Sequence, residues 1–404
     1  MDGALTERER RFLALADPLA RRFAERAAQH DADGSFPHEN FADLRDAGLL
    51  GLTAPEECGG LGANELEYTL TLERLAWGDT STALALGMSL SNIGQIAEGH
   101  LWPDHAPALF REVARDGAML NAAQAEREMG SPSYGGLPGA TARREPDGGW
   151  RLDGRKIYTT GAPGLRYFIV MATVHEEGQP PRIGDFLVPS DAPGVRIEPT
   201  WNALALRASG SDDVVFDHTP LPDDALLSAR TPGEPDPRAA LGLPWGSLTL
   251  AAVYTGAAQA ARDAIVHFAA TRKPTALGKP LGELPNVRMR LGEIESLLLA
   301  SRRVMLGLAA DWVASPDARP ALRQQAPLVK VITTSNAVRI TDIALRIAGG
   351  QGLQRGKPLE RIFRDVRAGL VNAPIEDVVL QNAGKSAVDA AITSATVSAD
   401  DSSL

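Results

Sequence analysis

The hydrophobic periodicity of the chain changes twice, and this order limits the folds open to it. Apolar residues recur at spacings of three and four from Phe12 to Phe23 and again from Leu291 to Trp312, as on helices that bury one face. Short β-branched runs lie between these regions, separated by Pro and Gly turns. The sequence predicts an α+β fold with an N-terminal helical domain over 1–118, a β domain over 119–228 and a helical bundle over 238–392. The small, polar segment 393–404 is expected to be a flexible tail.

The order of elements also excludes one common nucleotide-binding fold. The predicted strands are not separated by helices, as they are in a Rossmann domain. Residues 150–158 are predicted to form two short strands joined by a tight turn at Asp153-Gly154, because this dipeptide is a strong hairpin signal. The β domain is therefore expected to be a barrel or sandwich of short strands.

Charge and composition narrow the class of protein further. The formal net charge of -10 over 404 residues argues against a nucleic-acid partner, which requires a basic excess. Cys58 is the single cysteine, so no internal disulfide is expected, in keeping with a reducing, cytoplasmic location. No apolar run approaches the roughly 20 residues of a membrane helix, and the charged beginning of the chain predicts no signal peptide.

The residues alone reveal no familiar catalytic motif. The sequence contains neither H-E-x-x-H nor G-x-S-x-G, the patterns of zinc proteases and of many acyl hydrolases. Residues 349–352 read Gly-Gly-Gln-Gly, which taken alone is a glycine-rich helix stop. Without further information, the sequence predicts an α+β protein with a central β domain.

Six short segments, taken in order, resemble the acyl-CoA dehydrogenase superfamily. Residues 154–161 read GRKIYTTG and resemble the family's "G-x-K-x-W-I-T-N", and residues 344–352 read ALRIAGGQG and resemble "A-x-Q-x-x-G-G-x-G". The other segments are residues 47–62, 206–222, 271–281 and Arg364-Asp365. The resemblance spans nearly the whole chain. It implies an N-terminal helical domain, a middle β-barrel or sandwich domain and a C-terminal four-helix bundle, assembled as a homodimer or homotetramer.

The same resemblance implies a bound FAD. It places Thr160 near flavin N5, with Tyr158 and Thr159 beside the ring and Ser131 near the flavin or its phosphates. Arg272 would reach the pyrophosphate of a neighbouring subunit's FAD, since a planar cation suits phosphate. Arg346, Gly349 and Gly350 would lie at the adenosine diphosphate end. Arg346 replaces a Gln of the family, so FMN or a diffusible reduced flavin also remains open. The implied substrate contacts are Gln124 and Ser211.

The chain departs from the family at the catalytic base. Dehydrogenases of this family remove a proton α to a thioester with a Glu, which lies about nine residues after the Arg of "R-D". Ala373 occupies that position, and Gly246 occupies the position used by a minority of relatives. The neighbouring candidates are Asn372, which can hydrogen-bond an oxygen but cannot act as an acid or base, and Glu376, which a small shift of register would bring into question.

The missing base leaves three functions open. The stretch from Arg364 to Pro374 resembles the branch of flavin-dependent monooxygenases that take reduced flavin from a separate reductase, and we favour this reading. The second is an acyl-CoA dehydrogenase with a relocated base that passes electrons to an electron-transfer flavoprotein. Glu126, Glu128 and Asp212 could replace the base, although each is expected to be solvated. The third is a catalytically silent paralogue that binds acyl-CoA or flavin. The expected substrate is accordingly a small molecule or an acyl thioester.

Overall fold

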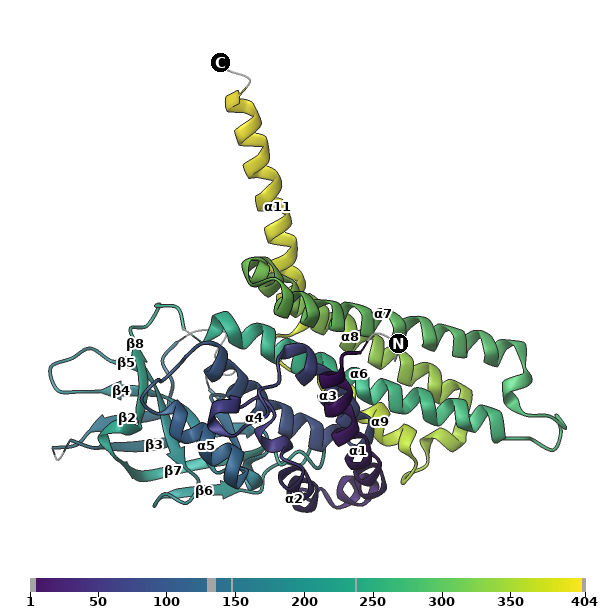
Figure 1. Cartoon of the computed structure of the whole chain (residues 1–404), viewed down its shortest axis with the longest axis horizontal. Coiled ribbons are helices and arrows are strands. Elements are labelled where there is room, and N and C mark those ends of the chain that lie inside the picture. Colours follow the sequence, from purple (N-terminus) through teal and green to yellow (C-terminus); the bar gives the residue numbers. More distant parts are fainter. Residues whose placement is uncertain (1–4, 129–135, 147, 237, 402–404) are drawn as a thin grey trace.

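The computed structural model describes residues 5–128, 136–146, 148–236 and 238–401. In the order of the chain the elements are helices, strands and helices again (Figure 1). The predicted α+β class and its order of layers are confirmed.

Three of the N-terminal helices begin after a residue whose side chain accepts hydrogen bonds from the free backbone amides of the first helical turn. Thr6 and Asn64 each form a capping box with the Glu three residues further on, and Asp79 accepts a hydrogen bond from the amide of Thr82. The helices are α1 (Glu7–Asp33), α2 (His38–Asp46), α3 (Glu65–Gly78), α4 (Thr80–Glu98) and α5 (Ala106–Asp116), with 3-10 turns η2 (Leu49–Gly51) and η3 (Glu56–Cys58).

The strands of the middle region pair into one mixed sheet. Eight described strands pair in the order β6-β7-β3-β2-β4-β5-β8, with β1 added beside β4. Both β1 and β2 run parallel to β4, whereas the other pairs are antiparallel. The strands are β1 (Leu120–Ala123), β2 (Thr141–Arg144), β3 (Trp150–Thr159), β4 (Tyr167–His175), β5 (Arg182–Pro189), β6 (Val195–Glu198), β7 (Asp212–Leu221) and β8 (Leu226–Arg230). The 3-10 turns η5 (Ala162–Gly164) and η6 (Asp223–Ala225) lie between them.

The hairpin predicted at Asp153-Gly154 is wrong. These residues lie inside β3, where the register against β7 shifts between Leu152 and Gly154. A Cβ at Gly154 would lie 2.6 Å from the Cβ of Ala140, and the φ of Gly154 is +148°. Glycine is therefore required at a bulge that lets β3 continue. An Asp-Gly pair suits a tight turn or a bulge, and pairing with both β2 and β7 selects the bulge.

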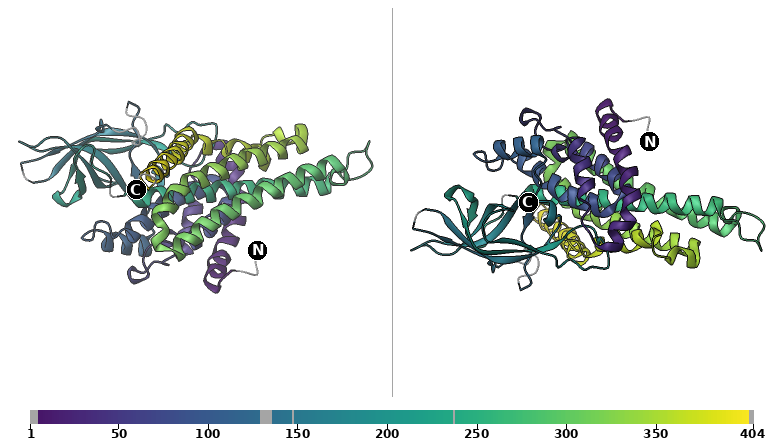
Figure 2. Two further views of the ribbon diagram at one scale, coloured as in Figure 1. Left: turned by 90° about the horizontal axis from the view of Figure 1, so that it is seen from above. Right: turned by 90° about the horizontal axis from the view of Figure 1, so that it is seen from below.

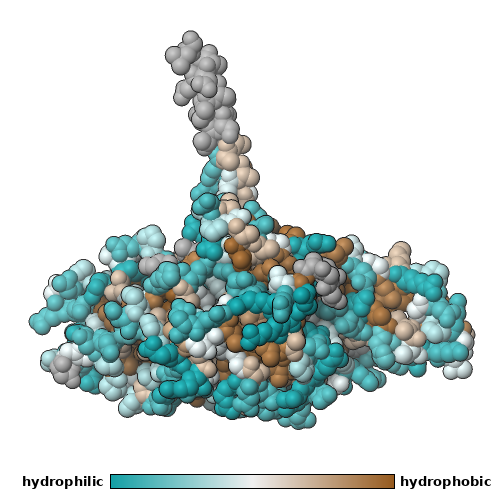
Figure 3. Space-filling view, in the orientation of Figure 1, coloured by the Kyte–Doolittle hydropathy of each residue, from teal (hydrophilic) through white to brown (hydrophobic). Residues whose placement is uncertain are grey.

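Long helices form the C-terminal region. Helices α6 (Ala239–Thr271), α7 (Pro285–Ala314) and α8 (Arg319–Ala348) lie side by side (Figure 2), and α3 packs against α6. The remaining elements are η7 (Leu281–Glu283), η8 (Pro316–Ala318), η9 (Gly349–Leu353), α9 (Pro358–Asp365), α10 (Ala368–Val371) and α11 (Glu376–Asp401). Helix α11 extends into segment 393–404 and projects from the body (Figures 1 and 3). Over the described residues, no helix is long and apolar enough to cross a membrane.

The loop between β6 and β7 ties the sheet to the helical bundle. The carboxylate of Asp365, at the end of α9, accepts a hydrogen bond of 2.7 Å from the amide of Leu206. Arg364 donates to the carbonyl of Leu204 over 3.0 Å. Burial raises the pKa of Asp365 to about 7, against the lowering effect of this amide. These contacts hold residues 204–211 close to the segment that leads into α10 and α11.

Candidate functional site

The first group of candidate residues lies where β3 ends. The Thr160 hydroxyl is 3.0 Å from the hydroxyl of Ser211, which is 2.8 Å from that of Ser209. The Thr160 carbonyl accepts a hydrogen bond of 2.9 Å from the side chain of Asn121, on β1. The structure therefore brings together two predicted residues, Thr160 and Ser211, from segments about 50 residues apart.

The residues before Thr160 point to opposite sides of the sheet. Tyr158 adopts a φ of +56°, its side chain is 65% exposed, and its ring meets the Trp201 ring edge-on at 6.2 Å. Thr159 is buried, and its hydroxyl has no hydrogen-bond partner among the described residues. Tyr158 and Thr160 thus face an accessible surface, whereas the Thr159 hydroxyl faces the interior.

Sequence reasoning missed Asn121 and Ser209. Asn121 also accepts a hydrogen bond of 3.2 Å from Asn92, which links the group to α4. An asparagine within the apolar run from Met119 to Ala123 was the available signal, because a polar side chain in a buried strand needs a partner. Gln124, predicted as a substrate contact, is half-buried, and its carbonyl lies 3.4 Å from the Lys156 ammonium.

Two of the three substitute bases are buried rather than solvated as expected. Glu126 accepts hydrogen bonds from the amides of Gly139 and Ala140 at 2.6 and 3.0 Å and pairs with Lys156 at 2.5 Å. Burial lowers the pKa of Lys156, and Glu126 opposes this change. Asp212 is also buried and accepts from the amide of Trp201 at 2.9 Å. Both carboxylates are engaged in holding the fold.

The second group lies where α10 leads into α11. The Tyr254 hydroxyl, on α6, donates to the side-chain oxygen of Asn372. The Lys330 ammonium, on α8, donates to the carbonyls of Gly369, Asn372 and Pro374 at 2.7, 2.9 and 3.1 Å. Two distant parts of the chain, α6 and α8, therefore position Asn372. Burial raises the pKa of Tyr254.

Burial also perturbs the cation of this group. Lys330 is 1% exposed, and this burial lowers its pKa to about 8, while Glu376 opposes the shift. Glu376 begins α11 and is half-buried. Its carboxylate is therefore close enough to act on Lys330 through electrostatics. Lys330 was another residue that sequence reasoning missed, because its position within a helical stripe gives no sign of its carbonyl partners.

Neither Gly246 nor Ala373, the two positions expected to carry the catalytic base, has a carboxylate, and both positions have open space around them. A Cβ built at Gly246 meets no atom within 4 Å, and the neighbouring Ser247 hydroxyl is buried without a partner among the described residues. Ala373 is exposed. The side-chain nitrogen of Asn372 makes no hydrogen bond within the part of the chain that the structure describes, so it can donate to a bound molecule.

The residues predicted to hold the far end of FAD lie apart from both groups. Arg272 follows α6, and Gly349 follows α8, at the end of the bundle that points away from the sheet (Figures 1 and 2). Arg346 is exposed and pairs with Asp342 over 2.8 Å. A Cβ at Gly349 or Gly350 would meet nothing within 4 Å, so this surface is open to approach. Ser131 lies outside the described residues.

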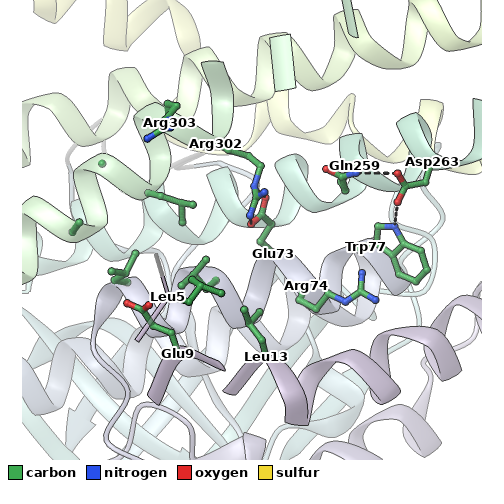
Figure 4. A pocket seen from close by; sticks show the side chains of 15 residues that line it. Leu5, Glu9, Leu13, Glu73, Arg74, Trp77, Gln259, Asp263, Arg302 and Arg303 are labelled. Carbon is green, nitrogen blue, oxygen red and sulfur yellow. Dashed lines mark hydrogen bonds and ion pairs between the residues drawn. The ribbon is translucent and has the colours of Figure 1, made fainter. Parts of the chain in front are cut away.

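A large cavity lies elsewhere. Its volume is about 920 Å³, and α1, α3, α6 and α7 enclose it (Figure 4). Part of its polar lining is paired internally, with Glu73 bound to Arg302 and Trp77 bound to Asp263. None of the predicted site residues that the structure describes lines it.

Comparison with known proteins places this geometry in a family. Models of the acyl-CoA dehydrogenase N-terminal, middle and C-terminal domains match residues 6–99, 122–219 and 248–373. The putative acyl-CoA dehydrogenase YdbM of Bacillus subtilis is 38% identical over 93% of this chain and 96% of its own length. L-evernosamine nitrososynthase of Micromonospora is 33% identical over 90% of this chain and 86% of its own length.

Solved structures agree with the sequence matches. KijD3 in complex with dTDP superposes with a TM-score of 0.83 at 30% identity, covering 95% of this chain and 98% of that one. TdsC of Paenibacillus sp. A11-2, with FMN and indole, gives 0.83 at 23% identity over 93% of this chain and 96% of that one, which shows the fold alone. The chain therefore belongs to the acyl-CoA dehydrogenase superfamily.

Proposed function

We propose that this protein is a flavin-dependent monooxygenase that uses reduced flavin to oxygenate a small or carrier-bound substrate. One observation carries the proposal: Ala373 and Gly246 provide no carboxylate at the two positions where the resemblance to the family puts the catalytic Glu. A dehydrogenase needs this base to remove a weakly acidic carbon proton, whereas oxygenation of a substrate does not. Three relatives named as nitrososynthases, at 31 to 33% identity, support this reading.

The first group of residues fits a flavin ring. The exposed ring of Tyr158 offers a flat surface, and the Thr160 hydroxyl can donate to a ring nitrogen while it accepts from Ser211. A structure of the relative KijD3 contains FMN, so FMN and FAD are both candidates. When bound, the reduced flavin supplies the electrons that activate oxygen.

Asn372 serves in this proposal as a hydrogen-bond donor to the substrate. Tyr254 occupies its side-chain oxygen, and Lys330 holds its backbone carbonyl. These contacts orient its side-chain nitrogen, which has no hydrogen-bond partner among the described residues. A fixed donor orients a substrate without taking a proton from it. Gln124 and Ser211 are proposed as further contacts on the sheet side.

The residues predicted to contact the two ends of FAD lie far apart in one chain, and this separation supports a homo-oligomer in which two copies share each FAD. Arg272 and Gly349 lie far from Thr160 in one chain, so one FAD bound at Thr160 would meet them only on a second copy. Apolar side chains also gather at the surface where α11 leaves the body (Figure 3), and Leu380, Val388 and Ile332 are exposed. We propose a homodimer or homotetramer.

A dehydrogenase with a relocated base is the second candidate. The 38% identity to a putative acyl-CoA dehydrogenase favours it, as does Glu376, which lies three residues after Ala373 at the start of α11. Glu376 would then remove the proton, and an electron-transfer flavoprotein would accept the electrons.

The two candidates are separated by rapid mixing of the flavin-loaded protein. In the absence of oxygen, acyl-CoA esters are expected to leave the flavin oxidised. After chemical reduction, mixing with oxygen is expected to give a transient absorbance that differs from oxidised flavin. Bleaching by an acyl-CoA that is lost in Glu376→Gln would instead establish the dehydrogenase, and failure to bind flavin would reject both.

Thr160→Val is expected to weaken flavin binding about five- to tenfold, because it removes one hydrogen bond to the ring. Titration followed by the quenching of flavin fluorescence measures the affinity. Thr231→Val, at an exposed position in the linker, is the matched control and should bind as the wild type does. Equal affinity in Thr160→Val and the wild type would contradict the placement of the flavin.

A further inference from the structure

A second, smaller cavity carries an excess of positive charge. Its volume is about 360 Å³, near the lower end of the range for small-molecule sites. It lies between the end of α1, residues 203–207 and the segment that leads into α9. Five cationic side chains but only two carboxylates line it: Arg207, Arg355, Lys357, Arg361 and Arg364, with Asp31 and Glu360. This excess stands out in a chain whose net charge is -10.

Both carboxylates are occupied by a single arginine. Arg364 binds the two oxygens of Asp31 at 2.5 and 3.0 Å and an oxygen of Glu360 at 2.9 Å. Arg207 donates to backbone carbonyls, the nearest being that of Asp31 at 2.6 Å. Within the described residues, Arg355 and Lys357 are exposed and make no ion pair. Four cations therefore remain without a carboxylate of their own.

Arg361 is the buried member of this set. Its residue is 8% exposed, and within the described ranges it forms neither a hydrogen bond nor an ion pair. Asp365 acts on it electrostatically, but the two form no ion pair among the described residues. Burying a charge without a close partner is costly, so an anion in the cavity would be stabilised.

The cavity also has an apolar side. Leu204 and Leu353 line it and are 67% and 69% exposed. Exposed leucines beside a cluster of cations suit a ligand with an anionic group and an apolar portion. Of the residues assigned to the flavin, those that the structure describes do not line this cavity.

We propose that this cavity is a separate binding site for a small organic phosphate. Arg207, Arg355, Lys357 and Arg361 supply the counter-charge, because guanidinium groups match the geometry of phosphate oxygens. Leu204 and Leu353 contact the organic portion. This site goes beyond the proposed oxygenation and does not depend on it.

Calorimetric titration of the full chain with phenyl phosphate and with inorganic phosphate tests the site. Phenyl phosphate is expected to bind saturably and several times more tightly than inorganic phosphate. The double variant Arg355→Ala/Lys357→Ala is expected to lose about tenfold or more in affinity, as two charge-assisted contacts are removed. Because both side chains are exposed and unpaired among the described residues, this variant should fold normally.

Arg111→Ala/Arg323→Ala is the matched control, since it removes the same charge at exposed positions elsewhere. It should bind phenyl phosphate within about twofold of the wild type. An equal loss in both double variants, or absence of saturable binding, would overturn the site. Equal affinity for inorganic phosphate would overturn the organic ligand. Competition by saturating FAD or FMN would show that the cavity belongs to the flavin site and would overturn its separateness.

Discussion

Gly246→Glu is expected to raise the rate at which an acyl-CoA reduces the bound flavin by about 10²-fold or more, since a positioned general base contributes roughly 10²- to 10⁴-fold. The wild-type chain has no carboxylate here, and a Cβ at Gly246 meets nothing within 4 Å. The first carbon of a side chain therefore meets no neighbour at this position. Replacing a glycine inside α6 should also stabilise the helix by about 0.5–1 kcal/mol. Anaerobic stopped-flow absorbance measures the rate.

Gly246→Gln is the control for this gain. Glutamine has nearly the same size as glutamate and gains the same helix stability, but it cannot accept the proton. We expect Gly246→Gln to reduce flavin no faster than the wild type. Equal gains in both variants would show that occupancy of the space matters rather than basicity. Rapid reduction by the unmodified protein would show that it already has a base, and Glu376 would be the first residue to replace.

Lys330→Met is expected to lower the free energy of unfolding by about 3 kcal/mol, because a lost hydrogen bond that leaves a buried group unpaired costs about 1–3 kcal/mol. The Lys330 ammonium donates to the carbonyls of Gly369, Asn372 and Pro374. Methionine has a similar length but donates nothing. Urea unfolding measures the change through the midpoint. Lys279→Met, at an exposed lysine, should remain within about 0.5 kcal/mol of the wild type.

The cost of Lys330→Met should depend on pH. Burial lowers the pKa of Lys330 to about 8 from the ordinary value of 10.5. Between these values the unfolded chain holds a proton that the folded chain has released, so raising the pH through this window favours the folded wild type. The variant lacks this group. The difference in unfolding free energy should therefore grow from pH 8 to about 10.5, and a constant or falling difference would contradict the perturbed pKa.

The architecture could largely be predicted from the sequence because it depends on patterns spread over many residues. Stripes such as Leu291 to Trp312 require long helices that bury one face, and their positions on either side of the β-branched runs set the order of layers. Local signals were less reliable. Asp153-Gly154 suits a hairpin or a bulge, and only pairing of β3 with both of its neighbours selects the bulge.

The candidate site likewise contains residues that the sequence could predict and contacts that it could not. The motif GRKIYTTG indicated Thr160, and the resemblance to the family named Ser211 as a substrate contact, because motifs are contiguous in the chain. Only the structure showed that the two hydroxyls lie 3.0 Å apart. The carbonyl partners of Lys330 and the burial of Glu126 were not predictable, since each depends on segments that meet only after folding.

The sequence by itself determined the succession of helices, strands and helices, and the absence of a carboxylate at residues 246 and 373. The tertiary structure decided that Asn372 is held between Tyr254 and Lys330, from 118 and 42 residues away. It also decided that Arg361 is buried and forms no ion pair with any described residue. The physical reason is that periodicity and composition are carried by each segment alone, whereas hydrogen-bond satisfaction and charge compensation depend on which segments pack together.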